Sequence, residues 1–181
     1  MEQDLASLAA TVAELKANAS ATNGTFAETF YYLTIPLMVL IHVGFLAYEM
    51  GASRSKNALA SGIKNILAFA FMVPTFYFFG WYIYLSFYNG FLPAEDASGW
   101  PWEMSMGPNL ADNATGIFWA AFTLFAATTA SIFSGAVIER IQTAGFLILA
   151  ILLGSVVWIL GGAWGWHPTG WLTVKFGYHD V

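Results

Sequence analysis

Four long apolar segments, separated by stretches that hold most of the charge, constrain this chain more than any other feature. They cover about residues 30–48, 63–87, 117–138 and 146–164. Each is near the roughly 20 residues that an α-helix needs to cross a bilayer. Only 9% of the residues are charged and 58% are hydrophobic, whereas a soluble domain carries roughly 25% charged residues. The pattern predicts an all-α integral membrane protein surrounded by a lipid bilayer.

The N-terminal segment 1–27 has a different pattern. Apolar residues recur there at helical spacing among alanines and charged residues: Leu5, Leu8, Val12 and Leu15. This spacing predicts a short amphipathic helix that packs on its own protein or on a neighbouring copy. Residues 18–25 are polar and predict a linker. We therefore divide the chain into an extracellular helix and linker (1–27) and a transmembrane domain (28–181).

The charges predict the orientation in the membrane. Basic residues gather in the first and third connections between spans: Arg54, Lys56, Lys64 and Arg140. The opposite side holds only Lys16 and Lys175, together with most of the acidic residues. Because connections rich in lysine and arginine stay in the cytoplasm, we expect a multi-pass protein of the cell membrane. Its N-terminus and its second connection, about 88–114, would be extracellular or periplasmic.

Composition excludes several classes of function. The chain has no cysteine, so a disulfide, a cysteine nucleophile or a cysteine metal site is excluded. The net charge of −5 gives no basic patch for nucleic acid. His167 and His179 have no spaced partner for a metal site, and no nucleophile is followed by a suitable base. We expect no enzyme activity, no metal and no cofactor.

The third span has two faces. At 100° per residue, one face carries phenylalanines: Phe118, Phe122, Phe125 and Phe133. The opposite face carries small residues, which allow helices to approach closely in lipid: Ala120, Thr123, Ala127, Ala130, Ser131 and Ser134. From this pattern alone the phenylalanines could line a core, the lipid or a pathway, and a core or lipid contact is the commoner outcome.

Three ionisable residues lie at or near membrane depth, where such groups are usually paired or functional. His42 is expected to be a neutral imidazole bonded to a neighbouring helix. Glu49 is expected to pair with Arg54 or Lys56, and Glu139 ends the third span. Separately, Pro36 and Pro74 lie inside spans and should kink or locally open their helices.

Four sequence blocks resemble the ammonium transporter/Rhesus family. Ser134-Gly-Ala-Val-Ile-Glu-Arg-Ile141 is similar to the "(S/G)GA-x-x-ERI" end of the family's third helix. Gly44-Phe45, Glu49-Met-Gly51 and Arg54-Ser-Lys-Asn57 resemble "GF…LEAG…R-x-KN", and Lys64-Asn-Ile-Leu-Ala-Phe69 resembles "KN-x-L-D-F". Trp164-Gly-Trp-His-Pro-Thr-Gly-Trp-Leu172 with Gly177-Tyr-His-Asp180 resembles "W-x-W-GGGWL…G-x-x-D-F-A-G". The blocks keep the family's order and spacing over about residues 30–181.

The resemblance implies a fold and a function. The family fold has eleven transmembrane helices with the N-terminus outside and assembles as a homotrimer. This chain would supply the first four helices and stop before the fifth, where one of the family's two pore histidines lies. The implied function is transport of ammonium/ammonia, which is recruited at an outer aromatic site and passes through a hydrophobic pore. An ammonium sensor with a similar membrane domain, or a non-conducting accessory subunit, is the alternative.

Site residues are carried over by position. Phe125 lies fourteen residues before Glu139, as does a phenylalanine of the family's outer gate. Trp166 aligns with the tryptophan that walls the outer cation site, and Asp180 with the aspartate that supports that site. The chain departs from the family where the second gate phenylalanine would stand, because Ala121 occupies that position with Phe122 beside it. We therefore assign Phe125, Trp166 and Phe122 to the substrate pathway and Asp180 to a supporting role.

Overall fold

A computed structural model describes residues 2–103 and 113–180 of the chain. Every regular element in these ranges is helical. The helices are α1 (Glu2–Ala52), α2 (Ala58–Thr75), α3 (Trp81–Ser86), α4 (Asn113–Ala136), α5 (Thr143–Leu152), α6 (Ile159–Gly165) and α7 (Trp171–Phe176). Two π-helical turns, η1 (Phe76–Gly80) and η3 (Leu153–Trp158), connect α2 to α3 and α5 to α6.

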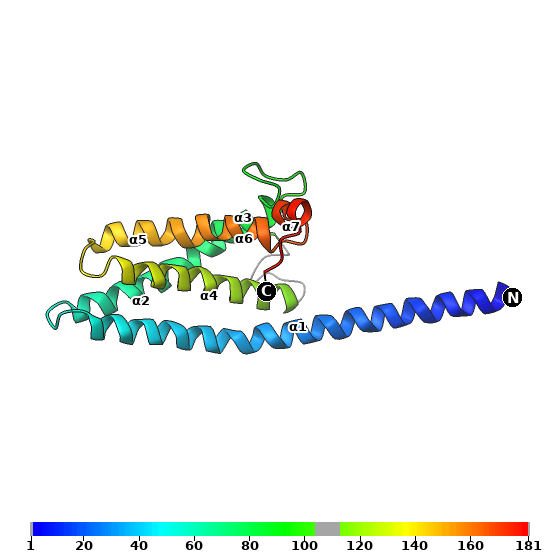
Figure 1. The fold of residues 1–181 in the computed structure, drawn as a ribbon, viewed down its shortest axis with the longest axis horizontal. Coiled ribbons are helices and arrows are strands. Elements are labelled where there is room, and N and C mark those ends of the chain that lie inside the picture. Colours follow the sequence, from blue (N-terminus) through cyan, green and yellow to red (C-terminus); the bar gives the residue numbers. More distant parts are fainter. Residues whose placement is uncertain (1, 104–112, 181) are drawn as a thin grey trace.

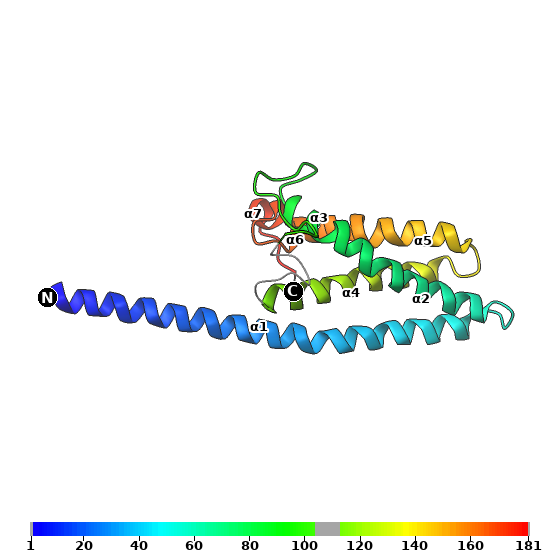
Figure 2. The ribbon, with the colours of Figure 1, turned by 180° about the vertical axis from the view of Figure 1, so that it is seen from behind.

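The described residues form four helical segments that are long and apolar enough to cross a membrane. They are Ser7–Ala52, Ala58–Ser86, Gly116–Ala136 and Thr143–Gly165. Their positions agree with the four spans predicted from hydropathy, and the chain is a multi-pass membrane protein. The four segments lie side by side as a bundle (Figures 1 and 2).

The bundle has two different ends. Residues 53–57 and 137–142 connect neighbouring helices at one end, which we call the hairpin end. At the other, α3, α6 and α7 lie close to the beginning of α4, and we call this the aromatic end (Figure 1). Part of the connection expected over 88–114 falls in 104–112, outside the described residues, and α4 begins at Asn113.

The first helix is longer than the sequence predicted. We expected a linker over 18–25, but α1 continues through these residues without a break. Threonine hydroxyls at Thr22, Thr25 and Thr29 donate to carbonyl oxygens four residues earlier, so these polar side chains are accommodated inside a helix. Alanines, which have the highest helix propensity, separate many of the polar residues.

Proline has different consequences in the two helices that contain it. Pro36 lies inside α1, which remains α-helical on both sides. Pro74 lies in the last turn of α2, and the π-helical turn η1 begins two residues after it. Because proline lacks an N–H and crowds the preceding turn, a change in hydrogen-bond register beside it is expected.

Small residues allow the central helices to pack closely. Ala126, Ala127 and Ala130 of α4 are at most 1% exposed and belong to the core cluster. A Cβ atom added at Gly154 of η3 would lie 2.7 Å from the Ala126 carbonyl oxygen, so only glycine fits this contact. Thr123, Ser131 and Ser134 are also buried, which confirms that the small face of the third span packs against neighbouring helices.

Candidate functional site

A cavity of about 860 Å³ lies at the aromatic end of the bundle. We call it the aromatic cavity. Its wall comes from α1, α3, α4, the end of α6 and the C-terminal tail, and is formed by Phe30, Tyr31, Thr34, Trp81, Tyr84, Leu85, Phe118, Phe122, Phe125, Gly165, Trp166, His167, Pro168, Thr173, Tyr178, His179 and Asp180. All four residues that the sequence assigned to the pathway and its support line this one cavity.

The aromatic rings of the cavity contact one another edge to face. The ring centroids of Phe122 and Trp166 are 5.9 Å apart with planes at 73°. Phe122 is only 7% exposed because it also belongs to the core. Phe125 and Trp166 are 36% and 37% exposed, so part of each ring remains open to the cavity. Phe122 thus anchors the wall, while Phe125 and Trp166 provide its accessible aromatic surface.

Trp158 connects the two accessible rings. Its centroid lies 6.2 Å from Phe125, with nearly parallel planes at 25°, and 5.6 Å from Trp166. Sequence analysis missed this residue. A signal was available, because Trp158 lies within a span whereas tryptophan is enriched at the membrane interface. A tryptophan at such depth indicates a contact that apolar side chains could not supply.

Asp180 holds the Trp166 indole in place. The Trp166 Nε1–H donates to Asp180 Oδ2 at 2.9 Å. Asp180 follows α7, which ends at Phe176 and is capped by Gly177 with φ +64°, a conformation that glycine adopts without strain. The turn brings the tail back toward α6. Asp180 also lines the cavity, so its carboxylate contributes negative charge there as well as orienting the indole.

Ala121 and Phe122 explain how the chain departs from the family pattern. Ala121 is fully buried, so it contributes nothing to the cavity surface. The neighbouring Phe122 reaches the cavity and contacts Trp81, Tyr84, Trp158 and Trp166. Phe122 therefore places an aromatic ring in the wall of the cavity, one position along α4 from the buried Ala121.

His167 lies between the cavity and the loop that follows α3. Its ring stacks on Tyr88, with centroids 4.4 Å apart and planes at 7°. Burial lowers the pKa of the His167 imidazole below its usual 6.5, an effect partly offset by the Asp96 carboxylate. The Tyr88 hydroxyl donates to Asp96 at 2.5 Å, and this hydrogen bond raises the pKa of Tyr88. The local arrangement favours a neutral imidazole beside the cavity.

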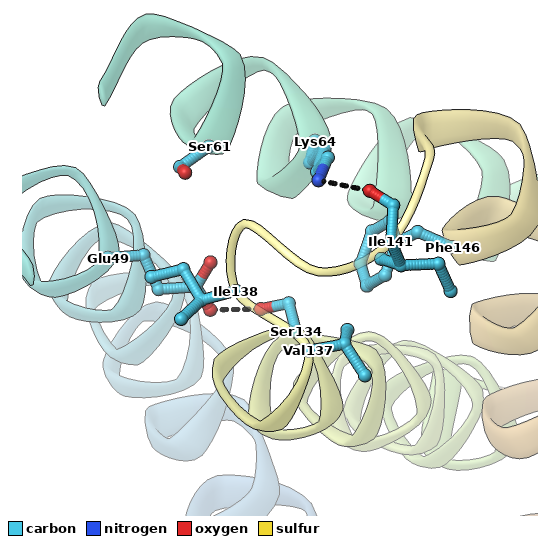
Figure 3. Close-up of a pocket in the computed structure, with 8 residues that line it drawn as sticks. All are labelled: Glu49, Ser61, Lys64, Ser134, Val137, Ile138, Ile141 and Phe146. Atoms are coloured by element: carbon cyan, nitrogen blue, oxygen red, sulfur yellow. Dashed lines mark hydrogen bonds between the residues drawn. The ribbon is translucent and has the colours of Figure 1, made fainter. Parts of the chain in front are cut away.

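Near the hairpin end, a buried carboxylate connects three helices (Figure 3). Glu49 of α1 is 2% exposed. It accepts a hydrogen bond from Ser134 Oγ of α4 and one from Asn65 Nδ2 of α2 at 2.7 Å. We call these three residues the carboxylate cluster. The space beside it holds only about 10 Å³, roughly the volume that one water needs. The cluster is therefore closed to a solute of ammonium's hydrated size.

Among the residues that the structure describes, Glu49 forms no ion pair with a basic residue, contrary to the prediction from sequence. Arg54 instead bonds Glu139, with Nε 2.7 Å from Oε2 and the Arg54 backbone N–H 2.7 Å from Oε1. The hydrogen bond from that N–H, supported by Asn57 and the guanidinium, lowers the pKa of Glu139. The turn after α4 gives Glu139 a φ of 58° and aims its carboxylate at the α1–α2 connection. Sequence spacing could not reveal a partner 85 residues away.

His42 is bonded to a neighbouring helix, as predicted. Its Nδ1 lies 3.2 Å from Ser131 Oγ, and its Nε2 lies 3.2 Å from the Leu124 carbonyl oxygen and 3.3 Å from Thr128 Oγ1. Both ring nitrogens thus contact α4, and the ring meets Phe69 of α2 edge to face at 5.3 Å. In the part of the chain that the structure describes, no group of three histidine, aspartate or glutamate side chains could hold a metal ion.

Comparison with known proteins shows the family of this chain. The model of the "Ammonium Transporter Family" matches residues 29–181. A putative ammonium transporter of Synechocystis sp. is 32% identical over 148 residues, which cover 80% of this chain and 32% of that protein. A second one from the same organism is 30% identical over 138 residues, or 72% of this chain and 23% of that protein.

An archaeal relative gives the same result. Ammonium transporter Amt2 of Archaeoglobus fulgidus is 28% identical over 137 residues, which cover 76% of this chain and 28% of that protein. The chain thus spans about a quarter to a third of the relatives that it matches. No solved structure matches it. The family model, the order of the sequence blocks and the four-span helical fold agree that this chain belongs to the ammonium transporter family.

Proposed function

We propose that this chain forms part of a membrane transporter for ammonium or ammonia, and that the aromatic cavity recruits the ion. One observation carries the proposal. Phe122 and Phe125 of α4 and Trp166 at the end of α6 all line the same cavity, where Asp180 fixes the Trp166 indole. The relatives that share this sequence are named ammonium transporters.

The chemistry of the cavity suits a small cation. An ammonium ion that loses water can recover about 0.5–2 kcal/mol over each aromatic face that it contacts. Phe125 and Trp166 have accessible ring surface, and the Asp180 carboxylate adds negative charge. Hydrogen-bond acceptors at such a site favour an ion with N–H donors over potassium, which has none.

Passage beyond the cavity needs a different form of the substrate. A whole charge in the bilayer interior costs several kcal/mol or more. We therefore propose that a proton is removed and that neutral ammonia crosses an apolar constriction in the complete transporter. Phe122, which is almost entirely buried behind Trp166, is the residue of this chain that would stand between the cavity and that route.

The orientation and assembly belong to the same proposal. The basic residues Arg54, Lys56, Lys64 and Arg140 lie near the hairpin end, so this end would be cytoplasmic by the positive-inside rule. The aromatic cavity and the N-terminus would then face outward, where ammonium arrives. We further propose the family's arrangement of eleven helices per subunit and three subunits per assembly.

The test uses a hybrid transporter. Residues 29–181 replace the matched segment of the Synechocystis relative that is 32% identical, and the hybrid is produced in cells that lack their own ammonium uptake. We expect the hybrid to restore ammonium uptake and Trp166→Leu to reduce it, with weaker discrimination against potassium. Trp102→Leu is the matched control, because Trp102 is 73% exposed and does not line the cavity.

Each outcome bears on one part of the proposal. A hybrid that reaches the membrane but transports no ammonium would contradict a transport function for this segment. Normal uptake and normal potassium discrimination in Trp166→Leu would contradict the recruitment site alone. Equal losses in Trp166→Leu and Trp102→Leu would indicate a general effect of removing tryptophan.

A further inference from the structure

The N-terminal part of α1 extends well beyond the bundle. In both views it continues past the aromatic end as a single straight rod (Figures 1 and 2). Every residue from 7 to 26 is exposed, a length of about 30 Å at 1.5 Å per residue. We call residues 7–26 the helical extension. It lies outside the part of the chain that the family model matches, and the proposed function does not account for it.

The helical extension carries an apolar stripe at alternating spacings of three and four residues. Its apolar members are Leu8, Val12, Leu15, Ala19 and Phe26, with the polar Thr22 at the remaining position, and Leu5 continues the spacing toward the N-terminus in the sequence. Leu8 and Leu15 are 61% and 62% exposed. Between these positions the extension has mainly alanine and polar side chains. Two apolar positions in each heptad, with small or polar residues elsewhere, are the pattern of a coiled-coil seam.

The direction of the extension argues against the bilayer as its partner. An amphipathic helix that binds a membrane surface lies in the plane of the interface. Here the extension continues the axis of a membrane span, so it points away from the bilayer into water (Figure 1). Most of the stability of a helix in a protein comes from packing of its apolar face, which favours a partner that covers the stripe.

Anchoring in the membrane makes copies of this chain the best-fitting partner. All copies insert in the same direction, so their extensions are parallel and begin at the same height above the bilayer. Confinement also raises their effective concentration. In a parallel coiled coil, the residue just before one seam position lies opposite the residue just after the next seam position of the partner helix. In this extension the rule places Thr11 of one copy opposite Lys16 of the other. No like charges meet there.

We propose that the helical extension forms a parallel, in-register coiled coil between copies of this chain, with Leu8, Val12 and Leu15 in its seam. The face of α1 that packs on α2 and α4 stays engaged in each subunit, because residues 7–26 are exposed and partial burial begins at residue 27. The seam would join subunits above the membrane.

Disulfide cross-linking tests the proposal directly in membranes. The chain has no cysteine, so each variant carries a single thiol. Two cysteines form a disulfide only when their Cα atoms lie within about 7 Å. We expect a cross-linked dimer for Leu8→Cys, Val12→Cys and Leu15→Cys under mild oxidation. Ala10→Cys and Ala17→Cys, on the outer face of the same helix, are the matched controls and should give at most about a tenth of that product.

A second set of variants separates the seam from chance collisions. In the Val12→Cys background, Leu8→Asp with Leu15→Asp should abolish the cross-link, whereas Ala10→Asp with Ala17→Asp should preserve it. These residues are exposed, so the substitutions leave the bundle intact. Equal cross-linking on both faces, no cross-linking on either, or a cross-link to a different protein would overturn the proposal. None of these results depends on ammonium transport.

Discussion

The aromatic cavity and the carboxylate cluster are both built where helices meet, but only one of them is open. Phe125 and Trp166 keep more than a third of their surface accessible, beside a space of about 860 Å³. Glu49 is buried, and both of its carboxylate oxygens accept hydrogen bonds from neighbouring helices. The difference teaches that an ionisable group at membrane depth can serve the fold, while uncharged rings line the open cavity.

The largest expected effect is a loss of stability on substitution of Glu49 in the carboxylate cluster. Glu49→Ala removes the carboxylate acceptor of Asn65 and Ser134, which keep only the Ser61 and Ser131 carbonyl oxygens, at a cost of about 1–3 kcal/mol in all. We expect a clearly lower Tm for the chain in detergent micelles, measured by circular dichroism. Glu49→Gln keeps an acceptor and should lose less. Glu14→Ala, on the exposed part of the same helix, is the control.

Cation binding by the Glu49→Ala variant is a second test of the comparison. If the two regions have separate roles, Glu49→Ala protein that is kept folded at low temperature should bind methylammonium with the same affinity as the parent chain. A normal Tm combined with lost methylammonium binding would show that Glu49 belongs to the substrate pathway and has no structural role.

The next largest effect should come from an accessible ring. Phe125→Leu removes one aromatic face from the cavity, worth about 1 kcal/mol, so methylammonium affinity should fall about fivefold. Titration calorimetry on the chain in micelles measures this change. Phe133→Leu is the matched control on the same helix, because Phe133 stacks on Phe146 and does not line the cavity. Equal losses in the two variants would return Phe125 to a packing role.

Different physical signals made these two regions unequally predictable from sequence. Hydropathy located the four spans because bilayer thickness fixes their length. The resemblance located Phe125, Trp166 and Asp180, since a local motif carries each of them. The partner of Glu49 depends on how α1, α2 and α4 meet, so no local pattern could identify Ser134 and Asn65.

Two other differences have local causes. The polar residues 18–25 predicted a linker, but the alanines among them favour a helix, and the Thr22 and Thr25 hydroxyls are accommodated by hydrogen bonds within it. Trp158 escaped notice because hydropathy treats it as one more apolar residue of its span. Its position between Phe125 and Trp166 emerges only from the packing of η3 on α4.

A smaller effect should follow acidification of the aromatic cavity. Burial lowers the pKa of His167, so the imidazole is neutral at pH 7 and becomes charged only as pH falls through a value below about 6.5. The added positive charge would repel ammonium, and the packing of the neutral ring would be lost over the same range. Between about pH 7.5 and pH 5.5, methylammonium affinity should fall up to about fivefold.

His179 also lines the cavity, so the variant His167→Gln tests which of the two histidines causes the pH dependence. It should flatten the pH dependence of methylammonium binding measured by the same calorimetry. A pH profile that is unchanged in His167→Gln would show that another group governs it. The carboxylate cluster is closed and hydrogen-bonded, so Glu49→Gln should leave the profile as it is.

The smallest effect should come from the ion pair at the hairpin end, outside both regions. Arg54 is 67% exposed and bonds Glu139 at 2.7 Å, and exposed pairs contribute little because water and salt screen them. The pKa of Glu139 is lowered in the folded chain, so its stabilising contribution is complete above the usual value of 4.5 and is lost as pH falls through the folded value. Arg54→Gln should therefore lower Tm only slightly at pH 7, and the difference from the parent should shrink in acid. A large loss of Tm, or a difference that grows in acid, would place this pair with the carboxylate cluster as a structural element of the hairpin end.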